Sequence, residues 1–167
     1  SDESESLSAK IISVYELLAD KELEIPQYQR PYKWTGKNIN QLFSDISIHK
    51  GRSAYRLGTI VFHKDGDKSN IVDGQQRTIS LLLAARALIK RSRERPLERK
   101  DLQVRLEKLD KEMVNPIFSS EISQKNIHNN YLEVARIVSR ADFTEAHIDF
   151  FLNKCQVVAV GLTDVSE

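Results

Sequence analysis

The sequence predicts an α+β fold, in which a small mixed sheet is covered by helices, followed by a helical segment and closed by a returning strand. Apolar residues recur at helical spacing over several long stretches, whereas β-branched residues are concentrated in three short runs, "YRLGTIVFH", "SNIVD" and "CQVVAVGL". The 167 residues are 40% hydrophobic and 29% charged, as in ordinary globular proteins. This length suffices for one domain with its own core and is marginal for two.

The first elements alternate between helix and extended chain. Ser8 is a plausible N-cap for a helix with apolar residues at helical spacing, namely Ile11, Ile12, Tyr15 and Leu18. The stretch "LEIPQYQRPYKW" contains two prolines, which exclude a regular helix and predict a short strand leading into a fixed loop. A second helix, capped by Thr35, is expected to run to about Lys50.

A hairpin and a long helix come next. "YRLGTIVFH" and "SNIVD" are joined by the turn "KDGDK", and "QQRTISLLLAARALIKRSRER" forms a helix that Pro96 ends. Three further helical stretches precede the strand "CQVVAVGL", which we expect to return to the sheet. We therefore expect a core unit over residues 8–95, a helical subdomain over 96–154, and a returning strand with a truncated C-terminus over 155–167.

Charge and composition exclude some classes of protein. The net charge of +1 provides no global field for nucleic acid or membranes, so any anion site must be local. The single cysteine, Cys155, lies in an apolar run and is expected to be a buried small hydrophobe in a reducing, cytoplasmic setting. No apolar run could span a bilayer, and the acidic N-terminus is unlike a secretory signal. Because the chain lacks a starting Met and stops just after a strand-like run, we expect a piece of a longer protein.

The stretch "NIVDGQQRTIS" places a polar cluster between a strand and an apolar helix. Asp73 ends the strand, Gly74 permits a sharp turn, and the unpaired N–H groups of the next helical turn favour a phosphate. Arg77 can add a bidentate fork, and Asp73 can hold Mg²⁺ or orient a water molecule. Gln75 and Gln76 can hydrogen-bond a ligand. The alternative is a plain helix start, with Asp73 as N-cap, Gln76 completing a capping box and Arg77 in solvent.

A second candidate site lies in "IPQYQRPYKW". Arg30 stands among amide and aromatic side chains: Gln29, Tyr28, Tyr32 and Trp34. An arginine among aromatics suits phosphate binding combined with stacking on a base. The alternative is an aromatic mini-core in which Arg30 makes a cation–π contact. The sequence leaves open whether Arg30 and Arg77 converge on one cavity.

A basic stretch from Arg86 to Arg105 is a weaker candidate. Its side chains Lys90, Arg91 and Arg93 could touch nucleic-acid phosphates, although the helical spacing of the apolar residues favours a solvated helix face. The four histidines are scattered without the spacing of metal ligands, and the chain contains no Walker-type loop, GxGxxG or nucleophile elbow.

Three of these segments together resemble a known family. "IPQYQRPYKW", "LGTIVF" and "IVDGQQRTISL", in this order and at about this separation, resemble the N-terminal domain of GmrSD-type restriction proteins. That domain is the DGQQR-motif relative of the ParB/sulfiredoxin fold. The resemblance covers residue 8 to about residue 90 well and continues more loosely through the helices and the closing strand. It implies a ParB-like mixed sheet whose strand–turn–helix junction binds a phosphate-bearing ligand.

The resemblance also implies a function. In this family the DGQQR motif is associated with binding and hydrolysing nucleoside triphosphates, with Mg²⁺, and this activity regulates a separate HNH-type nuclease that cuts modified phage DNA. Carried onto this chain, the nucleotide site consists of residues 73–77, and Tyr28, Gln29 and Arg30 lie on the facing loop. The catalytic roles are then carried by four side chains: Arg30, Asp73, Gln76 and Arg77.

The chain departs from the family pattern at its end. Family members usually continue after the strand matching "VVAVGL" into a helix and an Asn-x-Arg-Gly segment, whereas this chain ends at Glu167 and contains no HNH motif. We therefore expect a partner domain or subunit to supply the nuclease. Two other hypotheses remain open: a DNA-binding or modification-sensing module without NTPase activity, and a fragment that mainly contacts its partner. Homo-oligomerisation is also left open.

Overall fold

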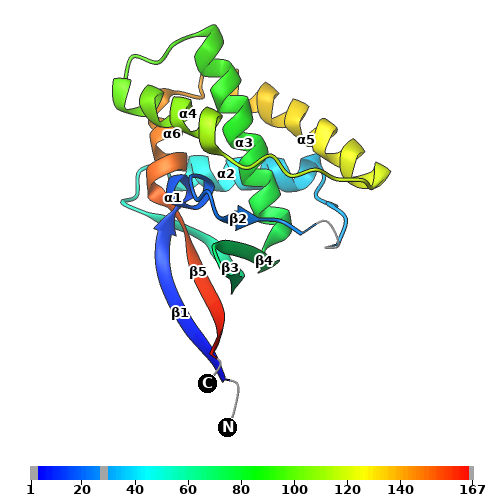
Figure 1. The fold of residues 1–167 in the computed structure, drawn as a ribbon. Coiled ribbons are helices and arrows are strands. Elements are labelled where there is room, and N and C mark those ends of the chain that lie inside the picture. Colours follow the sequence, from blue (N-terminus) through cyan, green and yellow to red (C-terminus); the bar gives the residue numbers. More distant parts are fainter. Residues whose placement is uncertain (1–3, 27–29, 166–167) are drawn as a thin grey trace.

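The computed structural model describes residues 4–26 and 30–165, and these form a five-stranded mixed sheet covered by helices (Figure 1). The strands are β1 (Ser4–Ser13), β2 (Leu23–Glu24), β3 (Tyr55–Asp65), β4 (Lys68–Asp73) and β5 (Cys155–Val165), in the order β1-β5-β3-β4-β2. β5 runs parallel to β3 and β2 parallel to β4, whereas the other two pairs are antiparallel. The predicted α+β class with a mixed sheet and a returning strand is confirmed.

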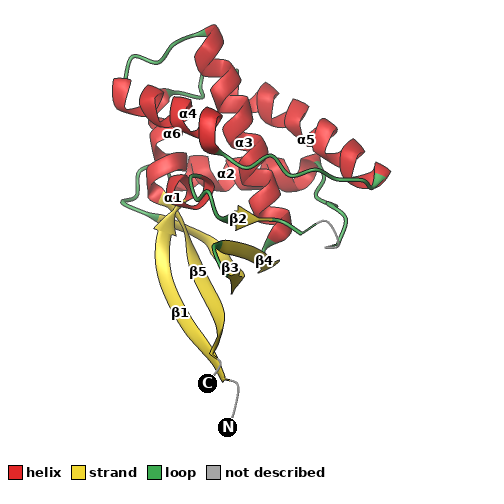
Figure 2. Ribbon diagram, viewed as in Figure 1, coloured by secondary structure: helices red, strands yellow, loops and turns green. Residues whose placement is uncertain are grey.

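The helices gather on one side of the sheet (Figure 2). They are α1 (Val14–Leu18), α2 (Gly36–His49), α3 (Gln75–Glu94), α4 (Lys100–Glu112), α5 (Glu121–Val138) and α6 (Glu145–Asp149), the last continued by the π-helical turn η1 (Phe150–Lys154). α3 runs through the helical layer, and β1 and β5 extend together away from it to the end where both termini lie (Figure 1). α3 ends at Glu94, next to the predicted boundary at Arg95–Pro96.

Several elements follow directly from local signals. Thr35 and Asn38 form the capping box that starts α2, and the helix buries its predicted apolar stripe of Ile39, Leu42, Phe43 and Ile46. The hairpin β3–β4 turns at Gly66, whose φ of +64° suits glycine. β5 pairs on both sides, with β1 and with β3, and lies in the interior of the sheet.

The prediction of a first helix starting at Ser8 is wrong. Residues 4–13 form β1, which pairs antiparallel with β5 from Ser4↔Val165 to Ser13↔Gln156. The helix that follows has only five residues and begins with a capping box between Ser13 and Glu16. Ile11, expected in the core, is 50% exposed on the strand. These residues form a strand rather than a helix because pairing with β5 provides a continuous hydrogen-bonded ladder. A local apolar pattern does not reveal this pairing.

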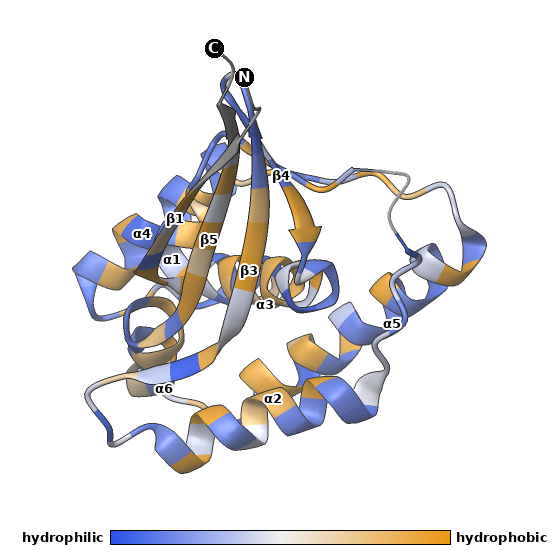
Figure 3. Cartoon of the chain, turned by 90° about the horizontal axis from the view of Figure 1, so that it is seen from below, coloured by the Kyte–Doolittle hydropathy of each residue, from blue (hydrophilic) through white to orange (hydrophobic). Residues whose placement is uncertain are grey.

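One large hydrophobic cluster joins the three predicted segments of the chain. Leu88 of the core unit, Val134 of the helical subdomain and Val157 of the returning strand all belong to it and are fully buried. Figure 3 shows apolar residues running along β3, β4 and β5 beside the helices. Cys155 lies in this core, where burial raises the pKa of its thiol to about 12. The division of the chain into three segments stays a prediction.

Candidate anion-binding site

The junction between β4 and α3 is built around Gly74. Its φ is +96°, and a Cβ added there would lie 2.5 Å from Ile60 Cδ1 and 3.2 Å from the carbonyl oxygen of Thr59. Glycine is therefore required both by the left-handed backbone and by the close approach to β3. Because of this sharp turn, α3 begins directly at Gln75, within one residue of the end of the strand at Asp73.

Among residues 4–26 and 30–165, no side chain caps the start of α3. Gly74 is the N-cap, so the alternative in which Asp73 caps the helix and Gln76 completes a capping box is wrong. The carboxylate of Asp73 is exposed, and no described residue forms a hydrogen bond or an ion pair with it. The backbone N–H groups of the first turn lie at the positive end of the helix dipole, and Asp73 ends the strand one residue before the N-cap.

Gln76 holds the neighbouring loop. Its Oε1 accepts a hydrogen bond from the Lys33 N–H at 2.7 Å, and its Nε2 donates to the Pro31 carbonyl at 3.1 Å. These two bonds join the motif to the "RPYKW" segment 43 and 45 positions earlier. The structure thus gives Gln76 a positioning role, while its predicted catalytic role stays a prediction.

Arg77 extends from the first turn of α3 across β3. A Cβ added at Gly58 would lie 2.8 Å from Arg77 Nη1, so the guanidinium rests against the bare backbone of Gly58. Its Cζ lies 5.9 Å from the centre of the Trp34 ring, at the outer limit of a cation–π contact. Its Nε is buried without a hydrogen-bond partner, and no carboxylate of the described chain pairs with it. A partly buried cation without a counter-charge favours an anionic ligand.

A cavity of about 230 Å³ opens beside this guanidinium, between α2 and the start of β3. Its wall combines the Trp34 ring and Tyr55 with the polar side chains of Asn38 and Asp45. Asp45 already accepts a hydrogen bond from Gln41 Nε2 at 2.9 Å. The cavity offers a cation, an aromatic ring and amides in one place, which suits a phosphate group with an attached ring.

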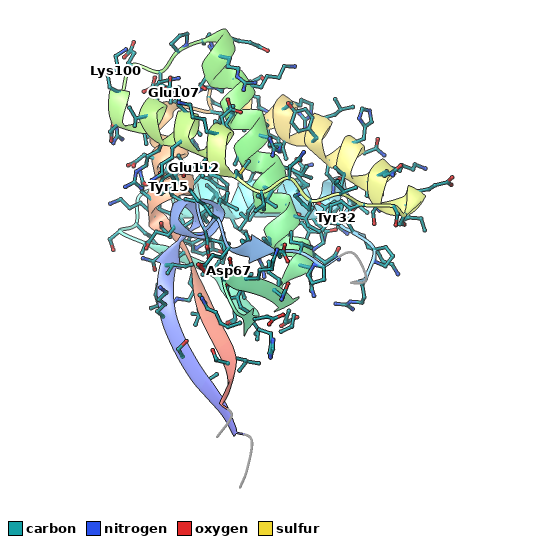
Figure 4. The ribbon with its side chains drawn as sticks, in the orientation of Figure 1. Tyr15, Tyr32, Asp67, Lys100, Glu107 and Glu112 are labelled. Atoms are coloured by element: carbon teal, nitrogen blue, oxygen red, sulfur yellow. The ribbon has the colours of Figure 1, made fainter. Side chains whose placement is uncertain are left out.

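The loop that carries Trp34 is held by α5. Asn130 Nδ2 donates to the Tyr32 hydroxyl at 2.9 Å and to the Trp34 carbonyl at 2.8 Å, and Ser123 Oγ accepts from the Tyr32 N–H at 2.9 Å. Tyr32 is fully buried, and burial raises the pKa of its phenol although hydrogen bonds with Ser80 and Asn130 oppose this. Figure 4 labels Tyr32 near α3 and α5. Sequence reasoning missed these α5 residues because nothing local marks them.

Arg30 lines a different cavity from the one beside Arg77. The side chain is exposed and lines a space of about 40 Å³ together with Gln75 and Ile79, whereas Arg77 lines the larger cavity beside Trp34. The structure therefore does not bring Arg30 and Arg77 to one cavity. Gln75 is 7% exposed and faces the Arg30 side. Tyr28 and Gln29 lie outside the described residues.

The predicted nucleic-acid side chains are engaged within the chain. Lys90 Nζ lies 3.9 Å from a Glu94 carboxylate oxygen, and Arg93 pairs with Asp110. Arg91 Nη2 donates to the Phe143 carbonyl at 3.0 Å, and burial lowers the pKa of its guanidinium. This arrangement agrees better with a helix face that packs on its neighbours than with one free to bind phosphates.

Asp73 is the acidic residue of the motif that could contribute to a metal site. In the described part of the chain, no three His, Cys, Asp or Glu side chains converge as metal ligands. Mg²⁺ is commonly held by one or two carboxylates together with the phosphates of a nucleotide and water. The exposed Asp73, beside an uncapped helix start, fits that use.

Comparison with known proteins gives one family. The sequence model of the GmrSD restriction endonuclease N-terminal domain matches residues 14–167. A search of curated proteins found no match. Among the described residues, no helix has the length and apolar character needed to cross a bilayer.

Proposed function

The chain belongs to the family of GmrSD restriction endonuclease N-terminal domains and is a component of a restriction system, and from this premise we propose that it binds and hydrolyses a nucleoside triphosphate. In this proposal, nucleotide turnover regulates a separate HNH-type nuclease domain or subunit that cuts modified phage DNA.

The proposal rests on the burial of Arg77 and on its lack of a charged partner among the described residues. Its guanidinium is partly buried against Gly58 and Trp34, its Nε has no partner, and it borders a cavity of about 230 Å³. Burying an arginine without a carboxylate is costly unless a ligand compensates it. A triphosphate supplies that negative charge, and the adjacent ring of Trp34 offers a surface for stacking.

In the proposed mechanism, each residue has a separate role. Arg77 and the first-turn amides of α3 bind phosphate oxygens and stabilise the charge that develops on the transferred phosphoryl group. Asp73 would hold Mg²⁺, which neutralises phosphate charge when bound. Gln76 keeps the loop at 31–33 against α3, so that Trp34 covers the guanidinium. A contribution from Arg30 requires movement of this loop, because Arg30 lines another hollow.

The test is binding of a fluorescent NTP analogue with Mg²⁺ to the parent chain and to Arg77→Ala. Loss of a charge-assisted contact should weaken binding roughly tenfold or more. Arg52→Ala is the matched control, because Arg52 is exposed and does not line the cavity. Asp73→Ala should then abolish hydrolysis while retaining most of the affinity. The proposal is wrong if Arg77→Ala binds and hydrolyses nucleotide as the parent does.

DNA binding without NTPase activity is the competing function. It would place a DNA phosphate at Arg77 and extend the contact along the basic stretch. The intramolecular contacts of Lys90, Arg91 and Arg93 weaken that extension. Affinity for a short duplex that falls steeply with salt, together with no affinity for NTP, would favour the DNA-binding function.

A further inference from the structure

A second cavity, of about 580 Å³, lies away from Arg77 between the sheet and the end of α4. Its floor is formed by neighbouring strands, with Lys10 on β1, Gly161 on β5, Lys64 on β3 and Ser69 on β4. Its roof is formed by the segment after α1 and by Glu112 at the end of α4. In Figure 4, Glu112 is labelled at the end of α4 that lies toward α1, and it pairs with Lys21 just after α1.

Gly161 creates the depth of this cavity. A Cβ added at Gly161 would lie 2.9 Å from Ser8 Oγ and 4.0 Å from Lys64 Cε. The side chains of Ser8 and Lys64 therefore reach over β5 from the two neighbouring strands, one from each side. This arrangement places a hydroxyl group and the lysine chain above the same backbone position.

Two buried polar atoms in the wall have no partner. Ser69 is only 1% exposed, and its Oγ forms no hydrogen bond with the described chain, although its backbone N–H is bonded to the Glu22 carbonyl at 2.8 Å. Glu112 Oε2 is likewise buried and unpartnered, while its Oε1 lies 3.4 Å from Lys21 Nζ. Unsatisfied buried polar atoms are uncommon in folded proteins, and a ligand with a donor and an acceptor could satisfy both of these atoms.

Four lysines and four acids line the cavity, but its strand floor carries only lysines, Lys10 and Lys64, whereas the acids lie on the roof. Three of the acids have partners: Glu16 accepts from the Ser13 N–H at 3.1 Å, Asp20 accepts from the Glu22 N–H at 2.9 Å, and Glu112 pairs with Lys21. The Glu22 carboxylate has no partner among the described residues. Three ammonium groups form no ion pair with any described residue: Lys10, Lys64 and Lys108.

We propose that this cavity binds a small phosphate ester that also carries a hydroxyl or amino donor, such as a nucleoside monophosphate or a sugar phosphate. The phosphate lies between Lys10 and Lys64 and accepts from the Ser69 hydroxyl, and the ligand donor bonds to Glu112 Oε2. The volume is within the usual range of small-molecule sites. The proposal rests on the residues that line this cavity and does not depend on the proposed NTPase site.

The test is a titration of the ¹⁵N-labelled chain in the Arg77→Ala background, so that the first candidate site does not contribute. The probes are AMP, glucose 6-phosphate, inorganic phosphate and a short DNA duplex. Amide shifts should move at Gly161, Lys64 and Ser69 but not at Gly58. The two esters should bind more tightly than inorganic phosphate, because only they offer a donor to Glu112.

Substitutions of lining residues test whether the esters bind in this cavity. Lys64→Ala should weaken ester binding roughly tenfold or more through loss of a charge-assisted contact, and Ser69→Ala and Gly161→Ala should weaken it as well. Lys37→Ala removes the same charge from an exposed position on α2 and should leave ester binding unchanged. Lack of binding by both esters at millimolar concentration, or equal affinities in Lys64→Ala and Lys37→Ala, would overturn the proposal. Tighter binding of the duplex than of either ester would also overturn it and assign the cavity to a DNA phosphate.

Discussion

Asn130→Ala should destabilise the fold and weaken the Arg77 site at once. The Asn130 side chain is 1% exposed, and its Nδ2 donates to the Tyr32 hydroxyl and to the Trp34 carbonyl. In the variant, the Tyr32 hydroxyl keeps its hydrogen bond with Ser80 Oγ at 2.7 Å, whereas the Trp34 carbonyl loses its hydrogen bond with Asn130. Two lost hydrogen bonds at about 1 kcal/mol each, with the further cost of a poorly satisfied carbonyl, give a loss of about 2 to 3 kcal/mol.

The measurement is urea unfolding of the parent chain, Asn130→Ala and Asn129→Ala, followed by circular dichroism at one temperature. Asn129 is the exposed neighbour on the same helix and should change the free energy of unfolding by less than about 0.5 kcal/mol. The m-value should stay constant, because the change removes contacts without altering the surface exposed on unfolding. Under folding conditions, Asn130→Ala should also bind the NTP analogue less tightly, because Trp34 loses an anchor.

Two results would refute this reasoning. If Asn130→Ala unfolds at the same urea concentration as Asn129→Ala, the bonds to Tyr32 and Trp34 do not stabilise the fold. If stability falls but nucleotide affinity is unchanged, the position of Trp34 does not govern the Arg77 site. The second outcome would separate the loop anchor from the function.

Three further changes test other parts of the structure. Gly74→Ala should cost about 2 to 4 kcal/mol by adding a strained left-handed residue and a clash with Ile60, measured by thermal unfolding. Hydrogen bonding by Arg136 lowers the pKa of the Glu133 carboxyl to about 2, so its stabilisation is present above the unfolded pKa and is lost as pH falls from about 5 to 2. The parent should therefore exceed Glu133→Gln in stability by about 1 kcal/mol at pH 7, after allowance for solvent screening, and this difference should vanish near pH 2. Cys155, fully buried and with a raised pKa, should resist iodoacetamide at pH 8 until urea unfolds the chain.

Local signals were sufficient for much of the fold. The hairpin was predicted because β-branched runs flank a turn containing Gly66, and α2 because Thr35 precedes a regular apolar stripe. The junction at Gly74 was predicted because a glycine between a strand and a helix permits a sharp turn. In each case the determining residues lie within one turn or one strand of the feature.

Features set by distant parts of the chain were not predictable. Residues 8–13 of β1 read as part of a helix because the strand's partner, β5, lies about 150 residues away, although the Ser13–Glu16 capping box gives a local signal for the true helix start. The separation of Arg30 from Arg77 depends on how α5 holds the loop through Ser123 and Asn130. The role of Gly58 had a local signal, because a glycine inside a strand often marks a close approach by another group.

The five polar residues from Asp73 to Arg77 divide into structural and chemical roles. Gly74 allows the turn, and Gln76 holds the loop through Lys33 and Pro31, so the structure accounts for these two without a ligand. Asp73 and Arg77 have no such account, because neither has a charged partner in the described chain. An unpaired carboxylate at the end of β4 and an unpaired guanidinium in the first turn of α3 suit a phosphate and its cation. Arg77→Ala should therefore remove most of the ligand affinity and Asp73→Ala should remove hydrolysis, while the fold stays intact in both variants.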